Sequence, residues 1–252
     1  MDRIIFITGA TSGIGKACAL KFAANGDHVI LNGRRKERLD ELQQQISKEY
    51  GVKVWQTPFD VQNREAVNAG IEALPAECKK IDVLINNAGL ALGRNYFDEA
   101  DVDDWDTMMQ TNVNGLLYVS KALLPLLISN RRAHILNVGS VAGKEIYEKG
   151  NVYCASKFAV DAISKSMRID LLRHKIKVTA IHPGAVKTEF AQVRFKGDME
   201  TAEKTYTGFK PLSPDDVADA IFYCTSVPEN VCINDLVITC TAQADAIHFL
   251  KQ

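Results

Sequence analysis

Tyr153 and Lys157 stand four residues apart and are the side chains of this chain best suited to acid–base chemistry. Residues four apart lie on one face of a helix, so both can project into one site. A phenol has a pKa of about 10, and a neighbouring ammonium is expected to lower it toward the working range. Ser140 can donate a hydrogen bond to an oxygen on which charge develops. The three side chains predict proton transfer to or from a substrate oxygen.

Three glycines, Gly9, Gly13 and Gly15, follow an apolar run, Arg3–Thr8, and lead into a helical pattern, Gly13–Asn25. Glycines allow a tight turn and a close approach to a pyrophosphate, and the helix N-terminus offers free N–H groups. The spacing G-x-x-x-G-x-G departs from the common dinucleotide fingerprint, and a strand–helix turn without a ligand could use the same glycines. Its place in the first βαβ unit favours dinucleotide binding. The predicted contacts are Gly9, Thr11, Ser12, Gly13, Ile14 and Gly15.

Arg34 and Arg35 follow the second predicted strand. An acidic residue near this point usually meets the adenosine ribose, but here the position is Gly33. Two guanidiniums can instead hold a 2′-phosphate through bidentate, charge-assisted hydrogen bonds. The same residues could also be the basic start of a solvated helix. Because the two arginines accompany the glycine turn, they predict that the cofactor is NADP rather than NAD.

Strand-like and helical patterns alternate along the whole chain, which predicts βαβ units and a doubly wound (Rossmann) parallel sheet with helices on both faces. The length of 252 residues fits one α/β domain spanning residues 1–252. Strands are predicted over Arg3–Thr8, Val29–Leu31, Val52–Thr57, Ile81–Ile85, His134–Val138, Val178–Ile181 and Asp235–Ile238. Helices are predicted over Gly13–Asn25, Lys36–Tyr50, Asn63–Leu74, Val102–Ile128, Val152–His174 and Pro214–Thr225. Lys187–Pro211 is expected to be an irregular substrate lid.

The composition excludes several classes of function. The net charge of −1 argues against a nucleic-acid-binding protein, which needs an excess of basic residues on one face. Ser120, Lys121 and Pro125 interrupt the most apolar stretch, so no membrane helix and no membrane partner are expected. The histidines and cysteines form no metal-binding motif, so no metal is predicted. A cytoplasmic enzyme with a small-molecule substrate is expected.

The segments Asn86-Asn87-Ala88-Gly89 and Tyr153-Cys154-Ala155-Ser156-Lys157 resemble the short-chain dehydrogenase/reductase family over nearly the whole chain. The resemblance implies a homotetramer, Tyr153 as the acid–base group, and a proton relay in which Asn112 holds a water and Lys157 touches the nicotinamide ribose. It implies further cofactor contacts from Asp60, Val61, Asn87, Ala88, Gly89, Pro183, Gly184, Val186 and Thr188. The family often has a serine where this chain has Gly139, and some NADP-using members have a basic residue at Ser12.

The stretch Val193–Asp198 is similar to the subgroup that oxidises 3-hydroxy acids such as serine and allo-threonine. We therefore expect Arg194, with Ser140 and Tyr153, to contact the substrate, although a lone arginine in a polar loop is often merely solvated. Two other functions stay open. One is a broad carbonyl or diketone reductase. The other is a non-catalytic cofactor-sensing protein, which would be expected to have lost Tyr153, Lys157 or Ser140.

Overall fold

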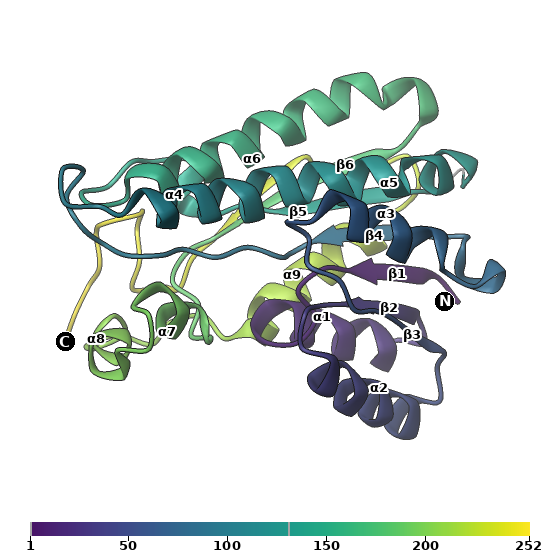
Figure 1. The fold of residues 1–252 in the computed structure, drawn as a ribbon, viewed down its shortest axis with the longest axis horizontal. Helices are drawn as coiled ribbons and strands as arrows, with labels where there is room; N and C mark the ends of the chain where they lie inside the picture. Colours follow the sequence, from purple (N-terminus) through teal and green to yellow (C-terminus); the bar gives the residue numbers. More distant parts are fainter. Residues whose placement is uncertain (1, 131) are drawn as a thin grey trace.

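The computed structural model describes residues 2–130 and 132–252, whose strands form one parallel sheet in the order β3-β2-β1-β4-β5-β6-β7 (Figure 1). This confirms the predicted doubly wound fold. The strands are β1 (Ile4–Ile7), β2 (His28–Asn32), β3 (Val54–Thr57), β4 (Val83–Asn86), β5 (His134–Val138), β6 (Lys177–Pro183) and β7 (Asp235–Ile238).

The strands near the centre are apolar because both faces of the sheet are covered. In β1, Ile5 and Ile7 pack into the core on one face, while Ile4 and Phe6 pack into the core on the other. Successive side chains of a strand point to opposite faces, so one short run supplies both cores.

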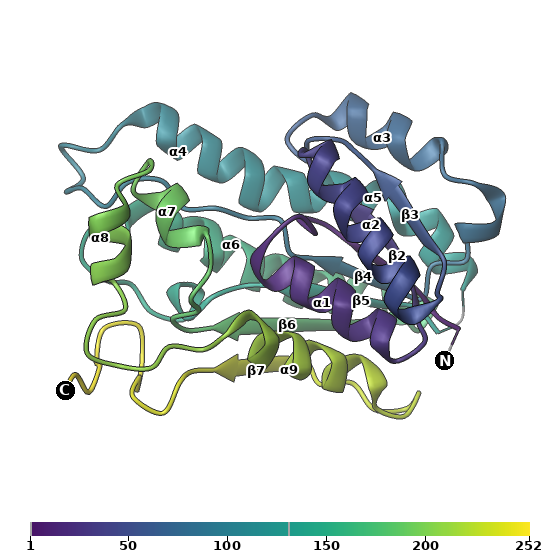
Figure 2. The same ribbon diagram turned by 90° about the horizontal axis from the view of Figure 1, so that it is seen from below.

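Two layers of helices sandwich the sheet (Figure 2). One layer holds α1 (Gly13–Ala24), α2 (Lys36–Tyr50) and α9 (Pro214–Ser226), and the other holds α3 (Arg64–Glu72), α4 (Val102–Met109), α5 (Leu116–Ser129) and α6 (Asn151–Asp170). Short 3₁₀ turns lie at Ala76–Cys78, Val141–Gly143 and Leu172–His174, so the last turn of the helix predicted over Val152–His174 is 3₁₀ rather than α.

A π-helical turn, Gln110–Gly115, joins α4 to α5 in one helix over Val102–Ser129. Contrary to the expectation from sequence, this helix is long and apolar enough to cross a membrane. Half of its most apolar window is buried inside the protein. The core helix of a soluble protein has these same properties.

The insertion Lys187–Pro211 was expected to be irregular, but it contains two short helices, α7 (Phe190–Arg194) and α8 (Met199–Lys204). Asp198 begins α8 by accepting a hydrogen bond from the Thr201 amide. Each helix spans only five or six residues, too few to show a clear apolar periodicity in the sequence. Both helices lie beyond the carboxyl ends of the strands (Figure 2).

The chain places β2 and β3 on one side of β1, and β4 to β7 on the other side. The strand order therefore reverses at the boundary between the neighbouring strands β1 and β4. Ligands of open α/β sheets bind outside the carboxyl ends of strands at such a point. The Asn87 side chain donates to the carbonyl oxygens of Thr8 and Gly9, which closes the floor of this crevice.

Candidate active site

A cleft of about 340 Å³ opens at the carboxyl edge of the sheet. It is lined by nearly all the residues that the sequence predicted, from segments far apart in the chain. These are Gly9, Thr11, Ser12, Gly13, Ile14, Arg34, Arg35, Asp60, Val61, Asn87, Ala88, Gly89, Ser140, Tyr153, Lys157, Pro183, Gly184, Val186 and Thr188. Three predicted residues, Gly15, Asn112 and Arg194, do not line it.

Gly15 has a packing role at the start of α1. A Cβ atom there would lie 2.3 Å from the Gly9 carbonyl oxygen, so a larger residue would force the turn open. Gly9 and Gly13 line the cleft with positive φ angles of 65° and 52°, which favour glycine.

The N-terminus of α1 carries no side-chain cap, because the hydroxyl of Ser12 accepts a hydrogen bond from Arg35 instead. Uncapped amides at a helix N-terminus suit an anion such as a pyrophosphate. The turn therefore has both the clearance and the donors that a dinucleotide requires.

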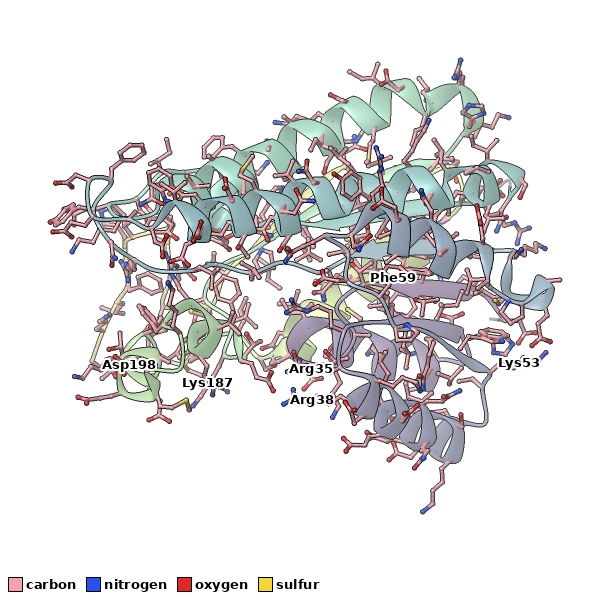
Figure 3. All side chains as sticks on the ribbon, viewed as in Figure 1. Arg35, Arg38, Lys53, Phe59, Lys187 and Asp198 are labelled. Atoms are coloured by element: carbon pink, nitrogen blue, oxygen red, sulfur yellow. The ribbon has the colours of Figure 1, made fainter. Side chains whose placement is uncertain are left out.

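Neither arginine at the end of β2 is free in this structure. Arg34 lies 3.3 Å from Asp60, and Arg35 donates to Thr11, Ser12 and Glu189. A phosphate bound here would have to take over contacts that carboxylates now make. Arg38, on the next turn of α2, also holds Glu189, at 2.7 Å; Figure 3 labels both arginines on the side facing α7.

Tyr153 is buried at the inner end of the cleft, where its ring packs on Phe190. Burial raises the pKa of its hydroxyl above the ordinary value, and the hydrogen bond with Ser140 and the charge of Arg194 only partly oppose that effect. We predicted that Lys157 would lower this pKa. In the structure the pKa moves the other way, and the cation with the largest effect is Arg194.

Arg194 lies against the tyrosine instead of in the open cleft. Its guanidinium carbon is 5.5 Å from the ring centre of Tyr153 and 5.7 Å from that of Tyr147, and its Nε donates to the Gly93 carbonyl. The segment 187–211 therefore brings one cation to the wall of the cleft, beside Tyr153.

Lys157 is buried one helical turn from Tyr153 and donates to the Val138 carbonyl at 3.0 Å. Burial without a carboxylate partner lowers its pKa to about 8. A cofactor ribose could take the place of that carbonyl as its partner.

The buried Lys157 should make stability depend on pH. The unfolded chain keeps this proton up to about pH 10.5, whereas the folded protein releases it near pH 8, so the lysine's contribution to the free energy of unfolding rises between these values. The full difference is about 3 kcal/mol, at about 1.4 kcal/mol for each pKa unit.

Urea unfolding at pH 7 and pH 10 tests this expectation. The free energy of unfolding should increase less between these two pH values for Lys157→Met than for the wild-type protein. The matched control is Lys165→Met, an exposed lysine of the same helix. Equal pH slopes for wild type and Lys157→Met would contradict a depressed pKa.

Asn112 lies in the π-helical turn, and both ends of its amide are occupied. It exchanges hydrogen bonds with the backbone of Leu90, at 2.8 Å each, and donates to Ser156. These contacts hold the Asn87–Leu90 segment against α6. Both N–H donors of the side chain are used, and its Oδ1 accepts one hydrogen bond, so the water that the family resemblance implied stays a prediction.

Gly139 departs from the family pattern for a steric reason. A Cβ atom there would lie 2.6 Å from Nδ1 of His182. The imidazole ring fills the space that a serine would need.

Sequence reasoning missed Glu189, which follows Thr188 and holds two arginines, and Tyr147, which shares Arg194 with Tyr153. It also missed His182, buried beside two aspartates. Glu189 lies 154 and 151 positions from the two arginines that it binds, so the sequence holds no local signal of its role. The other two depend on which strands and loops become neighbours.

Comparisons with known proteins agree with this geometry. A family model described as short chain dehydrogenase matches residues 3–198. An NADP-dependent 3-hydroxy acid dehydrogenase of Salmonella typhi is 44% identical, over 96% of this chain and 97% of its own length. Sulfoacetaldehyde reductase 2 of Chromohalobacter salexigens is 42% identical, over 97% of this chain and 96% of its own length.

Among solved structures, the closed form of a serine dehydrogenase complexed with NADP⁺ superimposes with a TM-score of 0.92. The two sequences are 42% identical, and the match covers 99% of each chain.

Proposed function

The chain belongs to the short-chain dehydrogenase family, and from this premise we propose that it transfers a hydride between NADP and a small 3-hydroxy acid such as serine or allo-threonine. The observation that carries the proposal is that Ser140 and Tyr153 line the cleft while the guanidinium of Arg194 lies directly behind the wall, 5.5 Å from the ring centre of Tyr153. A hydroxyl donor and a proton-transfer group in the cleft, with a cation beside them, suit an alcohol that carries an anion.

The residues present fit NADP. The glycine turn and the uncapped start of α1 would face the pyrophosphate, Arg34 and Arg35 the 2′-phosphate, and Asp60 and Val61 the adenine. Asn87 to Gly89 and Lys157 would border the nicotinamide ribose, and Pro183 to Thr188 the nicotinamide. When bound, the cofactor supplies the hydride acceptor or donor.

The chain's own contribution is to move the proton. Ser140 holds the substrate oxygen by a hydrogen bond, and Tyr153 gives a proton to that oxygen in reduction or takes one in oxidation. The raised pKa of Tyr153 keeps the phenol protonated, ready for reduction. Oxidation needs the pKa lowered, and the positive charge of Arg194 acts in that direction. Lys157 lies on the same face of α6, one helical turn from Tyr153, and donates to the Val138 carbonyl. Asn112 positions the segment beside it.

In a 3-hydroxy acid, one carbon separates the carboxylate from the carbinol carbon. A substrate oxygen held by Tyr153 therefore places the anion within reach of a cation on the lid side of the pocket. Arg194 is the lid cation beside Tyr153, and a planar guanidinium can hold both carboxylate oxygens. Lys144, four residues after Ser140, and Lys196, two residues after Arg194, are instead paired with aspartates.

Arg194→Leu should lower kcat/KM for serine or 3-hydroxybutyrate by about 10–100-fold, the value of a charge-assisted hydrogen bond of about 1.5–3 kcal/mol. The kcat/KM for a neutral alcohol of similar size should fall much less. The ratio of the two kcat/KM values separates the loss of carboxylate binding from any effect of the substitution on Tyr153. Lys196→Met is the matched control, since Lys196 is on the same loop but pairs with Asp104 at 2.9 Å. An equal fall on both substrates would mean that Arg194 only organises the lid.

The similarity to a sulfoacetaldehyde reductase favours a second candidate, the reduction of small anionic aldehydes. Such a substrate also has one carbon between its anionic group and its reacting carbon, so the same pocket would serve it. Absorbance assays with NADP⁺ and NADPH on 3-hydroxy acids, sulfoacetaldehyde, neutral alcohols and diketones separate the candidates. Turnover of only the neutral diketones would support a broad carbonyl reductase. The absence of any turnover would support a non-catalytic cofactor-sensing protein.

The proposal extends to a single catalytic domain over residues 1–252, with residues 187–211 as its lid, and to a cytoplasmic homotetramer. Exposed apolar side chains on the two long helices support subunit pairing there. They are Val102, Met109, Leu117, Ile128, Phe158 and Ile169.

A further inference from the structure

A buried histidine lies directly behind the catalytic serine. His182 is the last residue but one of β6 and is fully buried. Its Nδ1 is 3.3 Å from the carbonyl oxygen of Ser140, and the ring closes off the space beside Gly139. The residue that follows, Pro183, begins the turn that lines the cleft.

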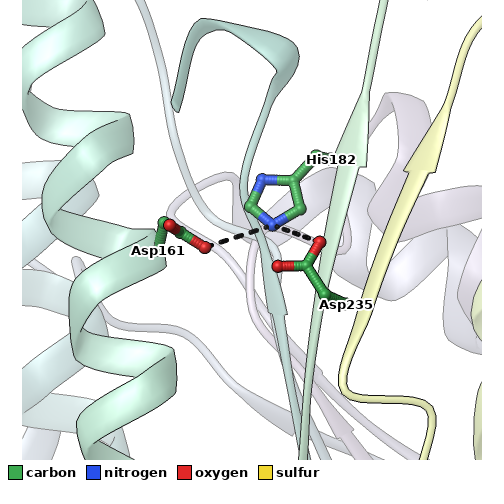
Figure 4. Close-up of side chains that lie close together, drawn as sticks. All are labelled: Asp161, His182 and Asp235. Carbon is green, nitrogen blue, oxygen red and sulfur yellow. Dashed lines mark ion pairs between the residues drawn. The ribbon is translucent and has the colours of Figure 1, made fainter. Parts of the chain in front are cut away.

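The other ring nitrogen faces two carboxylates (Figure 4). Nε2 is 3.6 Å from Asp161 on α6 and 3.4 Å from Asp235 on β7, and it makes no hydrogen bond with the described residues. Asp161 lies one helical turn beyond Lys157. The histidine thus connects the serine segment with the helix that carries Tyr153 and Lys157.

Two lysines neutralise the aspartates. Lys144 donates to Asp161 at 2.9 Å and to Asp235 at 2.6 Å, and Lys165 donates to Asp161 at 2.7 Å. Two carboxylates and two ammonium groups leave no net charge, so a neutral imidazole fits this surrounding. Burial and the charge of Lys144 lower the pKa of His182, while the two aspartates and the Ser140 carbonyl oppose that shift.

A neutral imidazole carries one proton, and its two nitrogens face only oxygen atoms here. A proton on Nδ1 can be donated to the Ser140 carbonyl, which leaves the lone pair of Nε2 facing the carboxylates. That arrangement is tolerable because Lys144 draws off their charge. By neutralising the carboxylates, Lys144 weakens the attraction that would otherwise favour a proton on Nε2, and so allows the tautomer that holds Ser140.

We propose that His182 is a positioning residue that fixes the Ser140 backbone through Nδ1–H, with Lys144, Asp161 and Asp235 setting its tautomer. The inference rests on the proposed dehydrogenase function only in that Ser140 acts on the substrate oxygen. Through His182, the charge of the half-buried Lys144 determines how the Ser140 hydroxyl is oriented.

The same three acidic and imidazole side chains could be read as a metal site, since their ligand atoms lie within 4.8 Å of one another. The geometry points to Lys144 instead, because its ammonium already binds both carboxylates. The cation of this cluster comes from the chain itself.

A double-mutant cycle between His182→Phe and Ser140→Ala tests the proposal. Phenylalanine keeps a planar aromatic ring and removes the donor, so His182→Phe should lower kcat about tenfold with KM for NADP unchanged. In the Ser140→Ala background the same change should lower kcat less than about twofold, because the serine it positions is gone. His134→Phe is the matched control: His134 is equally buried but bonded to Thr179, and its effect should be independent of Ser140.

A second measurement does not depend on His182→Phe folding or on any substrate. Lys144→Met removes the ammonium and leaves the two carboxylates, so the NMR titration of His182 should move to higher pH. The kcat profile should gain a dependence on pH in the same range. Lys165→Met, which removes the more exposed cation bonded only to Asp161, should move both much less.

Full additivity of His182→Phe and Ser140→Ala would overturn the proposal, as would an unshifted His182 titration in Lys144→Met. Binding of Zn²⁺ at micromolar concentration by the wild-type protein, lost in His182→Phe, would overturn it in favour of a metal site. These outcomes can be interpreted even if the proposed substrate is wrong. The titration needs no substrate, and the double-mutant cycle can use any compound that the enzyme converts.

Discussion

Tyr153→Phe is expected to lower kcat by about 10²–10⁴-fold, the usual contribution of a positioned proton-transfer group. The substitution removes only the hydroxyl, and the ring can keep its contact with Phe190 and its place under Arg194. Ser140, which forms a hydrogen bond with Tyr153, is a far weaker acid and cannot replace it. NADPH binding, followed by fluorescence or calorimetry, should remain close to that of the wild-type protein.

Tyr147→Phe is the matched control for this experiment. Tyr147 is also largely buried and lies under the same guanidinium, but it does not line the cleft. It should keep most of the activity. If Tyr153→Phe retained more than a tenth of wild-type turnover, the acid–base group would have to be another residue.

The second large effect concerns the choice of cofactor. Arg34→Ala combined with Arg35→Ala should lower kcat/KM for NADP by about 10²-fold or more, since each charge-assisted hydrogen bond contributes about 1.5–3 kcal/mol. Both arginines already bind carboxylates, so the lower end of that range applies. The value for NAD should change little, because NAD has no 2′-phosphate.

Arg64→Ala, an exposed arginine away from the cleft, serves as the control. Equal kcat/KM for NAD and NADP in the wild-type enzyme would contradict the assignment. Gly33→Asp, which would place an acidic residue at the usual position, is a poorer test of the cofactor choice. A Cβ atom there would lie 2.6 Å from a methyl group of Thr11, so the change would disturb the glycine turn as well as the charge.

All seven strands of the described residues were predictable, because each contains a short run rich in apolar side chains, and β1 to β3 are each followed by turn residues and a helical pattern. The residues at the strand ends were predictable for the same reason, since parallel strands bring their carboxyl ends to one edge. The helices α7 and α8 were not, because each has too few turns to show periodicity. The electrostatic effects within the site could not be predicted from the sequence either. Whether Lys157 or Arg194 governs Tyr153 depends on burial and on where the lid lies.

The engagement of Arg34, Arg35 and Asn112 was missed for a related reason. A sequence shows that a group can bind a phosphate or a water, but not that another side chain has reached it first. Glu189 is 154 positions from Arg35, and no local pattern connects the two.

The steric contact between Gly139 and His182 restricts the order in which this protein could have changed during evolution. A serine entering position 139 while the imidazole is present would meet its ring at 2.6–2.8 Å. The ring must therefore be replaced by something smaller first, and only then can position 139 accept a side chain. In the reverse direction, glycine must come before histidine. The pair should consequently show sign epistasis, with Gly139→Ser harmful in this background and harmless once residue 182 is small.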